Sequence, residues 1–396
     1  MKRVRILVDA LIAWRVIVAG CMVCCSAFFY DACAETTLTG AASEVLPPHN
    51  TEFITSTAFM LAGMKTPHCM GWEAVTATKA WQQFASSMDT KWKQFFATRG
   101  HRIATWRRTE LADIPDNATI FYPFSGPDFL YLSLLFPTAR HYVLIGLEPV
   151  GTIPHQDAIG QENIARCLAD IESSLEDILR ISFFKTNDMS KELTETCLTG
   201  ALPVLMIFLA RTSHTIHTVQ CFDLADNGTI QYRSVFPSGI EKHRCRGVEI
   251  RFSSSDNRLK TLTYLSANLS DNGLNRCPGC VSYFDGLAPP LVTFVKSASY
   301  LMHKPYFSRI RNFILHKSRM VLQDDSGIPY RFFDNKTWNV KLYGMYTGPI
   351  DLFKAHFEQD LAAAYRRGAA SLPFRFGYNR QSNMLRAIKI NNQHVP

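Results

Sequence analysis

Ser125, Asp128 and Glu148 are polar residues with chemical potential that lie in one stretch, Thr119 to Gly151. Ser125 and Asp128 flank a Gly-Pro pair, a pattern typical of a helix start, where their oxygens can accept free backbone N–H groups. Glu148 follows an apolar run of strand length and has no evident packing role. We expect Ser125 and Asp128 to cap a helix. Two roles remain open for Glu148: binding a ligand, or being held by neighbouring backbone donors.

A second group of polar residues follows the apolar run Leu202 to Leu209, which predicts a central strand buried on both sides. Arg211 and His214 are ligand-binding candidates there, and Arg211 would meet an anion at the carboxyl edge of the sheet. A metal site formed by His214 and His217 is disfavoured, because residues three apart in an extended segment face opposite sides. The sequence contains no His-Glu-x-x-His pattern, and we expect no metal.

Asp324 and Asp325 are adjacent acids that could act in acid–base chemistry or bind a ligand. Adjacent residues on a strand point apart, and the alternative is a turn that begins with aspartate. Ser125 lacks the Gly-x-Ser-x-Gly pattern of a nucleophile elbow, so the sequence does not support it as a nucleophile. No catalytic residue is assigned.

Seven cysteines follow residue 34, and Cys277-Pro-Gly-Cys280 has the spacing of a redox motif. In thioredoxin-like folds this motif begins a helix after a strand, whereas here it lies among turn-forming residues. We therefore expect a small disulfide between Cys277 and Cys280, or two unpaired thiols, rather than a catalytic pair. An odd number of cysteines leaves at least one thiol unpaired within the chain.

Thr119–Gly151 has the pattern of a strand, a helix and a second strand, which predicts a parallel pair with any ligand at its carboxyl edge. Asp226-Asn227-Gly228 between alternating segments predicts a hairpin. The remaining expected helices are 74–96 (ending the N-terminal helical part at Gly100), 161–181, 289–302, 307–320 and 350–366. The remaining expected strands are 248–252, 259–265, 321–323, 338–346, 372–378 and 384–390.

These elements predict an α/β fold with a mixed, mainly Rossmann-like sheet, helices on both faces and antiparallel strands in the C-terminal half. Residues 1–34 read as a signal peptide, 35–115 as a linker and helical segment packed on the core, and 116–390 as the core. With 396 residues and 47% hydrophobic content, the chain can bury a large core.

The first 34 residues have the pattern of an export signal: basic residues to Arg15, an apolar stretch from Val16 to Tyr30, and Ala32-Cys33-Ala34. We expect cleavage after Ala34 and a periplasmic or extracellular protein. Lipid attachment at Cys21, in the lipobox-like Val-Ala-Gly-Cys, is the less favoured alternative. The apolar stretch is short for a membrane span.

Removing residues 1–34 takes away four basic residues and two acids, which lowers the formal net charge from +8 to +6. The segment Gly286 to Gln323 and everything after Asp360 contain basic residues and no acid. Such a surface favours anionic lipid or glycan partners, although ordinary solvated faces would account for most of these residues. No nucleic-acid-binding motif is present, so we expect no nucleic acid.

The strand, glycine loop, helix and acid at the end of the next strand resemble nucleotide- and adenosylmethionine-binding domains in shape. Glu148 follows Gly126 by 22 residues, near the spacing at which such an acid meets a ribose. The chain has one glycine where that fingerprint has two or three, and Pro127 removes a backbone donor. We therefore expect no cofactor.

The stretches FYPFSGPDFLY, LIGLEPVG and LQDDSGIPYR also resemble a set of exported bacterial proteins without assigned function. That resemblance implies export and assigns no catalytic residue. The sequence favours a non-catalytic binding or structural protein on a Rossmann-like frame. The alternative is an extracytoplasmic hydrolase or transferase for a small polar or anionic substrate, which predicts one pocket lined by Glu148, Arg211, His214 and Asp324 or Asp325.

Overall fold

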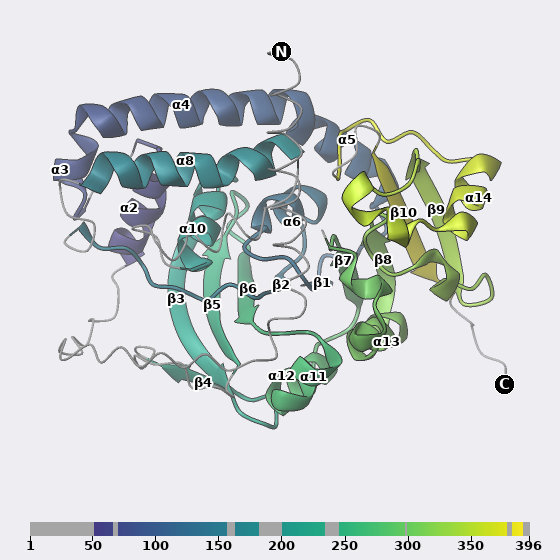
Figure 1. Cartoon of the computed structure of the whole chain (residues 1–396). Helices are drawn as coiled ribbons and strands as arrows, with labels where there is room; N and C mark the ends of the chain where they lie inside the picture. The colour runs from purple at the N-terminus through teal and green to yellow at the C-terminus, as the bar shows by residue number, and fades with distance from the viewer. Residues whose placement is uncertain are drawn as a thin grey trace, which may run out of the picture. The chain divides into compact units, whose positions relative to one another are not determined.

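A ten-stranded mixed sheet forms the centre of the protein, in the order β4-β3-β5-β6-β2-β1-β7-β8-β10-β9 (Figure 1). The computed structural model describes residues 51–65, 70–156, 163–181, 200–233, 245–297, 299–377 and 382–390. The expected signal peptide, its alternative Cys21 and the linker before residue 51 lie outside these residues. Residues from Leu46 to Pro396 belong to one compact unit.

The five central strands run parallel, and antiparallel strands extend the sheet on both sides. The central strands are β6 (Leu259–Ser266), β2 (His141–Gly146), β1 (Thr119–Tyr122), β7 (Leu291–Val295) and β8 (Ser318–Gln323). The flanking strands are β3 (Thr215–Leu224), β4 (Ile230–Arg233), β5 (Arg246–Ser253), β9 (Trp338–Gly344) and β10 (Asn383–Lys389). The predicted mixed α/β fold, with its antiparallel strands late in the chain, is confirmed.

Both faces of the sheet are covered, because strand residues alternate between two cores. Ile120 and Tyr122 face one hydrophobic cluster, whereas Phe121 faces the other. The first face is covered by α2 (Thr51–Leu61), α4 (Lys79–Phe95), α5 (His101–Glu110), α6 (Phe129–Leu135), α8 (Ile164–Ile181) and α10 (Leu202–Arg211). The second is covered by α11 (Asp271–Arg276), α12 (Pro278–Asp285), α13 (Ser308–Lys317) and α14 (Gln359–Arg367).

The chain reverses direction across the sheet at β1. From β1 it passes through α6 on the first face to β2, and it later returns to β7 on the other side of β1 before α13 leads to β8 on the second face. The carboxyl ends of β1 and β7 therefore form a topological switch point, the usual ligand position in open α/β sheets.

The expected strand at Leu202–Leu209 is wrong, because these residues belong to helix α10. Every residue from Leu202 to Ala210 is buried, so the apolar run has no periodicity that separates helix from strand. Pro203 lies in the first helical turn, where its missing N–H breaks no hydrogen bond. Arg211 therefore ends a helix and does not follow a strand.

The expected helix at Pro289–Met302 is also wrong, since Leu291–Val295 forms β7, buried along its whole length. Helix α13 stops at Lys317 and β8 begins at Ser318, earlier than expected. Residues 372–377 form no strand, and the expected helix at 350–366 is divided into a 3-10 helix, Asp351–His356, and α14. The N-terminal helical part continues past Gly100 into α5.

The elements with clear periodicity or turn chemistry match the prediction. The aromatic stripe of α4 is buried as expected, from Trp81 to Phe95. The hairpin of β3 and β4 turns at Gly228, whose φ of +81° requires glycine or a similarly tolerant residue. Helix α3 (Glu73–Thr76) precedes α4, and the π-helical turn η2 (Phe96–Gly100) continues α4 into α5. Within the described ranges, no helix is long and apolar enough to span a membrane.

Candidate functional site

A cavity of about 110 Å³ lies at the carboxyl ends of β1, β2 and β7, beside the switch point. Its polar groups come from Glu148, Asn268, Ser297 and Ser299. Its apolar and glycine lining is Phe124, Gly126, Ile145, Gly146, Leu147, Ala267, Leu269, Leu301 and Phe307. The volume is below the ~300–1,000 Å³ of pockets for drug-sized molecules, so the cavity admits only a small molecule or one end of a larger one.

Glu148 supplies the only side-chain carboxyl group among the residues that line this cavity. The residue is 8% exposed, and its carboxylate accepts a long hydrogen bond of 3.4 Å from the Tyr264 hydroxyl. Burial raises the pKa of Glu148 above its usual value, and hydrogen bonds from its own backbone, Tyr264 and the Leu147 backbone oppose that rise. No cation pairs with Glu148 among the described residues, so its carboxyl is partly satisfied yet electrically unbalanced.

Two glycines allow the Glu148 carboxylate to lie close to the backbone. A methyl group at Gly146 would overlap the Glu148 carboxylate, the Tyr264 hydroxyl and the Gly126 Cα atom. Gly126 also has a φ of +51°, in the left-handed region. Gly126 therefore serves the backbone conformation between β1 and α6, and Gly146 allows the close approach of Glu148.

Asp128 caps α6 as predicted, because its Oδ1 accepts the Tyr131 N–H at 3.3 Å. Its Oδ2 forms a buried ion pair with Lys296 at 2.7 Å and accepts the Tyr122 hydroxyl at 3.1 Å. Lys296 also lies 4.5 Å from the centre of the Tyr131 ring. Burial lowers the pKa of Lys296, and Asp128 opposes that shift. The ion pair ties the start of α6 to the end of β7.

Ser125 does not cap α6, so that prediction is wrong. Its hydroxyl donates to the backbone oxygens of Gly126 at 2.7 Å and Ile145 at 3.1 Å. Its N–H also donates to Ile145, so Ser125 prolongs the pairing of β1 with β2 beyond the strand end. The cap belongs to Asp128 because the helix begins at Phe129, three residues later than Ser125 would require.

Asp324 and Asp325 follow β8 and point to different partners, as expected for adjacent residues. Asp324 accepts the Ser326 N–H at 3.0 Å and its hydroxyl, which makes the predicted aspartate turn. Asp325 accepts the Tyr300 hydroxyl at 2.6 Å and the Asn383 amide at 2.8 Å. Burial and the neighbouring Asp325 raise the pKa of Asp324 to about 7. Both side chains are therefore used within the fold.

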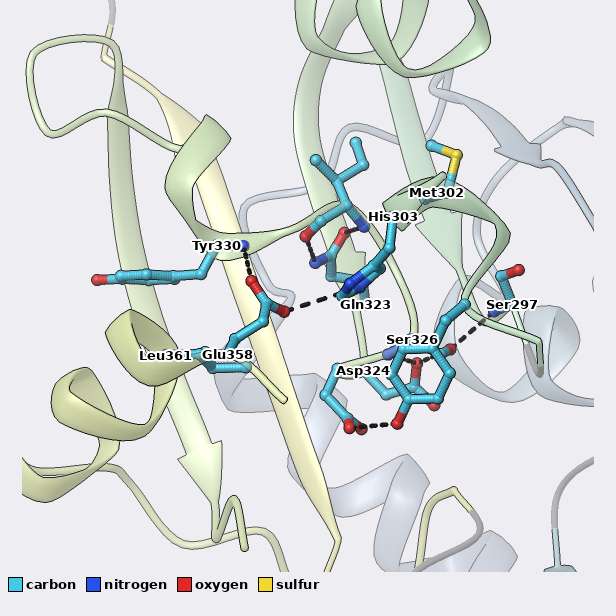
Figure 2. Close-up of polar contacts among 12 residues, drawn as sticks. Ser297, Met302, His303, Gln323, Asp324, Ser326, Tyr330, Glu358 and Leu361 are labelled. Carbon is cyan, nitrogen blue, oxygen red and sulfur yellow. Dashed lines mark hydrogen bonds and ion pairs between the residues drawn. The ribbon is translucent and has the colours of Figure 1, made fainter. Parts of the chain in front are cut away.

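Glu358 is another buried acid in this part of the fold. Figure 2 shows Glu358 between the Tyr330 backbone and His303, with Asp324, Ser326 and Ser297 forming a separate set. Glu358 accepts the Tyr330 N–H at 2.7 Å, and its Oε1 lies 3.7 Å from His303 Nε2. Burial raises the pKa of Glu358 to about 8 and lowers that of His303 to about 4. At neutral pH both groups are mainly uncharged.

A larger cleft, of about 580 Å³, lies at the opposite ends of β2 and β6. Its basic and aromatic groups include Arg107, Arg211 and His214. Its remaining lining is Phe96, Ser133, Leu134, Pro137, Thr138, Thr212, Ser213, Ser254, Ser255 and Asp256. The cleft is thus rich in hydroxyls and contains one acid, which already pairs with Arg258.

Arg107 makes no hydrogen bond or ion pair with any described residue, whereas Arg211 is fully engaged. Arg211 pairs with Asp89 at 2.5 Å and donates to the backbone oxygens of Ala62 and Gly63. Burial and the neighbouring Arg108 lower the pKa of Arg107. A guanidinium remains charged despite such a shift, so Arg107 is the group in this cleft that lacks a counter-charge.

His214 is buried and uncharged at neutral pH. Burial lowers its pKa to about 4, with a contribution from Lys260. Its Nδ1 lies 2.8 Å from the Thr212 hydroxyl, and its ring contacts Phe129 and Phe252 edge-on. His217 instead contacts Ser253 through Nε2 at 2.9 Å.

The ligand candidates therefore do not converge. Glu148 lines the carboxyl-edge cavity as expected, whereas Arg211 and His214 line the cleft at the other edge of the sheet. Their predicted place at the carboxyl edge is wrong because α10 is a helix. Asp324 and Asp325 line neither space.

The predicted Cys277–Cys280 disulfide is wrong as well. Cys277 is bonded to Cys245, which precedes β5, while Cys280 is a buried free thiol. The motif also begins a helix, because Cys277 is the N-cap of α12 and Pro278 is its first residue. The turn-forming residues near it mark the short connection between α11 and α12.

The acid-free segments do not form one free basic face. Lys296 and Arg311 are buried, Lys317 lies 3.6 Å from Asp285, and Arg386 lies 3.8 Å from Asp113. Acids distant in the sequence thus balance several of these charges. Arg319, Arg366, Arg367 and Arg375 are exposed.

Sequence reasoning missed the residues whose environment depends on tertiary packing. Lys296 lies in the segment 289–302 that was expected to be helical, although it follows an apolar run of strand length after Pro290, a signal that could have placed it. No local pattern in the sequence marks Arg107 or Glu358. The absence of a partner for Arg107 among the described residues and the burial of Glu358 follow only from tertiary packing.

The comparisons with known proteins add no relationship to this geometry. No protein-family model, curated protein or solved structure matches the chain.

Proposed function

We propose that the protein is an exported, non-catalytic binding protein whose small ligand occupies the carboxyl-edge cavity and presents a cationic or hydrogen-bond-donating group to Glu148. One observation carries this proposal: a buried carboxyl with no cationic partner among the described residues faces a cavity beside the switch point. An uncompensated buried acid is costly, and a ligand cation would remove that cost.

The apolar lining adds a second property of the ligand. Phe124, Leu301 and Phe307 face the same space as Glu148. A cavity of ~150 Å³ can hold benzene, so a space of about 110 Å³ suits a short alkyl chain or part of a ring. A primary amine with an alkyl chain combines both features.

The separation of the candidate residues favours binding over catalysis. The enzyme alternative requires Glu148, Arg211, His214 and one of the paired aspartates around one pocket, and they lie around different spaces. Glu148 is the titratable residue in the lining of the carboxyl-edge cavity. General acid–base catalysis by a pair of residues would need a second titratable group beside it.

The test is a thermal-shift series with n-butylammonium, n-pentanol and butanoate, which are similar in size but differ in charge. We expect n-butylammonium to raise the melting temperature most and butanoate not at all. Ligand at 100 times its Kd stabilises a protein by about 2.7 kcal/mol, a readily measured shift. Glu148→Gln should lose the ammonium response.

Glu249→Gln is the matched control, because Glu249 is a buried acid outside the cavity that already pairs with Arg251 at 3.0 Å. This variant should respond to n-butylammonium as the wild type does. An equal response in Glu148→Gln, or no response in the wild type, would remove the proposed ligand contact.

A second candidate function is supported by Arg107: the amino-edge cleft binds an anionic group of a glycan. The support is an unpaired, half-buried guanidinium among hydroxyl side chains, which are typical partners of sulfate and sugar oxygens. A sulfated disaccharide is the probe, and its affinity should fall with salt and with Arg107→Gln. Binding that is equal in Arg107→Gln and the wild type would reject this site.

Export itself rests on the leader sequence. N-terminal sequencing of the protein recovered outside the cytoplasm should begin at Glu35. A chain that begins at residue 1, or at a lipid-modified Cys21, would contradict cleavage after Ala34.

A further inference from the structure

Three cysteine sulfurs meet on the second face of the sheet, at the start of α12. The Sγ atoms of Cys245, Cys277 and Cys280 all lie within 4.8 Å of one another. Cys245 and Cys277 form a disulfide, and the Cys280 Sγ lies 2.8 Å from the Cys245 Sγ. A free thiol in contact with a disulfide has the proximity that thiol–disulfide exchange requires.

The surroundings distinguish the three sulfurs. Cys280 is fully buried and Cys245 is 5% exposed, whereas Cys277 is only partly buried. Cys277 is also the N-cap of α12, where the helix dipole stabilises a thiolate. Cys277 is therefore both the better leaving group and the sulfur best placed to meet an outside molecule.

We propose that these residues form a thiol–disulfide exchange centre, in which Cys280 releases Cys277 to react with an external disulfide. The Cys280 thiol gives its proton to a hydroxide ion from the solvent, and its sulfur forms a bond to the Cys245 sulfur. The Cys245–Cys277 bond breaks, and its electron pair stays on the Cys277 sulfur. The chain keeps one disulfide and one thiol, so this step needs neither oxidant nor reductant.

The released Cys277 thiolate then attacks one sulfur of an external disulfide. A mixed disulfide forms at Cys277, and the other half of the external molecule leaves as a thiolate. Burial raises the pKa of the Cys280 thiol to about 12, so the first step should become faster as the pH rises. Cys280 and the start of α12 are held against the β3–β4 turn, since a methyl group at Gly279 would overlap the Ala225 carbonyl.

Cys221 provides an internal control for reactivity. It is also a free, largely buried thiol, and burial raises its pKa to about 12 as well. It packs against the core of the first face, whereas the cysteine cluster belongs to the second. The two thiols therefore differ in their access to a disulfide rather than in acidity.

The test is incubation of the folded, non-reduced protein with oxidised glutathione, followed by digestion under acidic conditions and mass mapping. We expect wild type to carry glutathione at Cys277 together with a Cys245–Cys280 disulfide, at a rate that rises between pH 7 and 9. Cys280→Ser and Cys280→Ala should both lose this modification while melting cooperatively. Cys221→Ser should be modified at the wild-type rate.

Three results would overturn the proposal. One is wild-type protein in which the cluster keeps its Cys245–Cys277 disulfide and Cys277 gains no glutathione at any of these pH values. Another is equal modification of Cys277 in the wild type and both Cys280 variants. The third is stoichiometric zinc in the purified protein with all three thiols free, because the cluster would then be a metal site.

Discussion

The two ends of strand β2 differ in how they accommodate charge removed from water. At its carboxyl end, Glu148 lines a small cavity, and nearby strand ends carry Asp324 and the Asp128–Lys296 pair. At its amino end, a larger cleft contains Arg107 and other bases whose pKa values are lowered by burial.

The acids at one end and the arginine at the other respond differently to pH. Burial raises the pKa of acids, so Glu148 and Asp324 can take up a proton and become neutral. Arg107 cannot lose its proton in any ordinary range of pH. We therefore expect ligand binding at the carboxyl edge to depend on pH, and anion binding at the amino edge to depend on salt.

The largest effect should come from breaking the buried ion pair at the carboxyl edge. Asp128→Ala removes the carboxylate that pairs with the buried Lys296 ammonium, which should lower the free energy of unfolding by about 3–5 kcal/mol. Urea denaturation measures this change. Asp116→Asn, which removes one partner of an exposed pair with Arg258, should cause little change. Similar losses in the two variants would contradict the distinction between buried and exposed pairs.

The next effect concerns the raised pKa of Glu358, about 8 in the folded protein. A folded acid that holds its proton more tightly than the unfolded chain loses stability as pH rises from the unfolded pKa to the folded one. Stability should therefore fall between about pH 4.5 and 8, by at most about 1.4 kcal/mol per pH unit for this group. Glu358→Gln should remove that slope and stabilise the protein at pH 8.

Glu110→Gln is the control with the opposite sign. Hydrogen bonds from Lys341 and Tyr343 lower the pKa of Glu110 against the effect of burial. Its ionised form therefore contributes stability above the unfolded pKa, and this contribution is lost as pH falls through the lowered pKa. Glu110→Gln should destabilise the protein at pH 7. The same sign in both variants at pH 8 would contradict the assigned shifts.

The smallest effect should come from Ser125→Ala. The serine hydroxyl donates to the Gly126 and Ile145 carbonyls but caps no helix, so its loss should lower stability by about 1 kcal/mol. The n-butylammonium response should remain. A loss of several kcal/mol in thermal or urea unfolding would show that this short contact between β1 and β2 matters more than a single hydrogen bond.

The sequence predicted the elements that carry a periodic or turn-based signal. The parallel pair of β1 and β2, the β3–β4 hairpin and the buried stripe of α4 follow from local patterns. The sequence failed for α10 and β7, because short runs that are apolar on every side fit helix and strand equally well. Both runs are fully buried, so their structure is set by what surrounds them.

The candidate site was predicted only in part, because only some of its residues lie next to elements with a clear local pattern. Glu148 was found because it follows a strand that periodicity identifies, and strand ends are ligand positions. Arg211 and His214 were misplaced with α10. The Cys245–Cys277 disulfide joins residues 32 apart in the chain, and no local spacing indicates that pair.

The most direct test of the ligand site is the pKa of Glu148, measured by carbon-13 NMR of the side-chain carboxyl with and without n-butylammonium. We predict a pKa above the usual glutamate value in the free protein, because the buried carboxyl lacks a cation. We predict that n-butylammonium lowers it, because a bound cation favours the ionised form. An ordinary pKa in the free protein, or a raised pKa that n-butylammonium leaves unchanged, would contradict the assignment of Glu148 as the ligand contact.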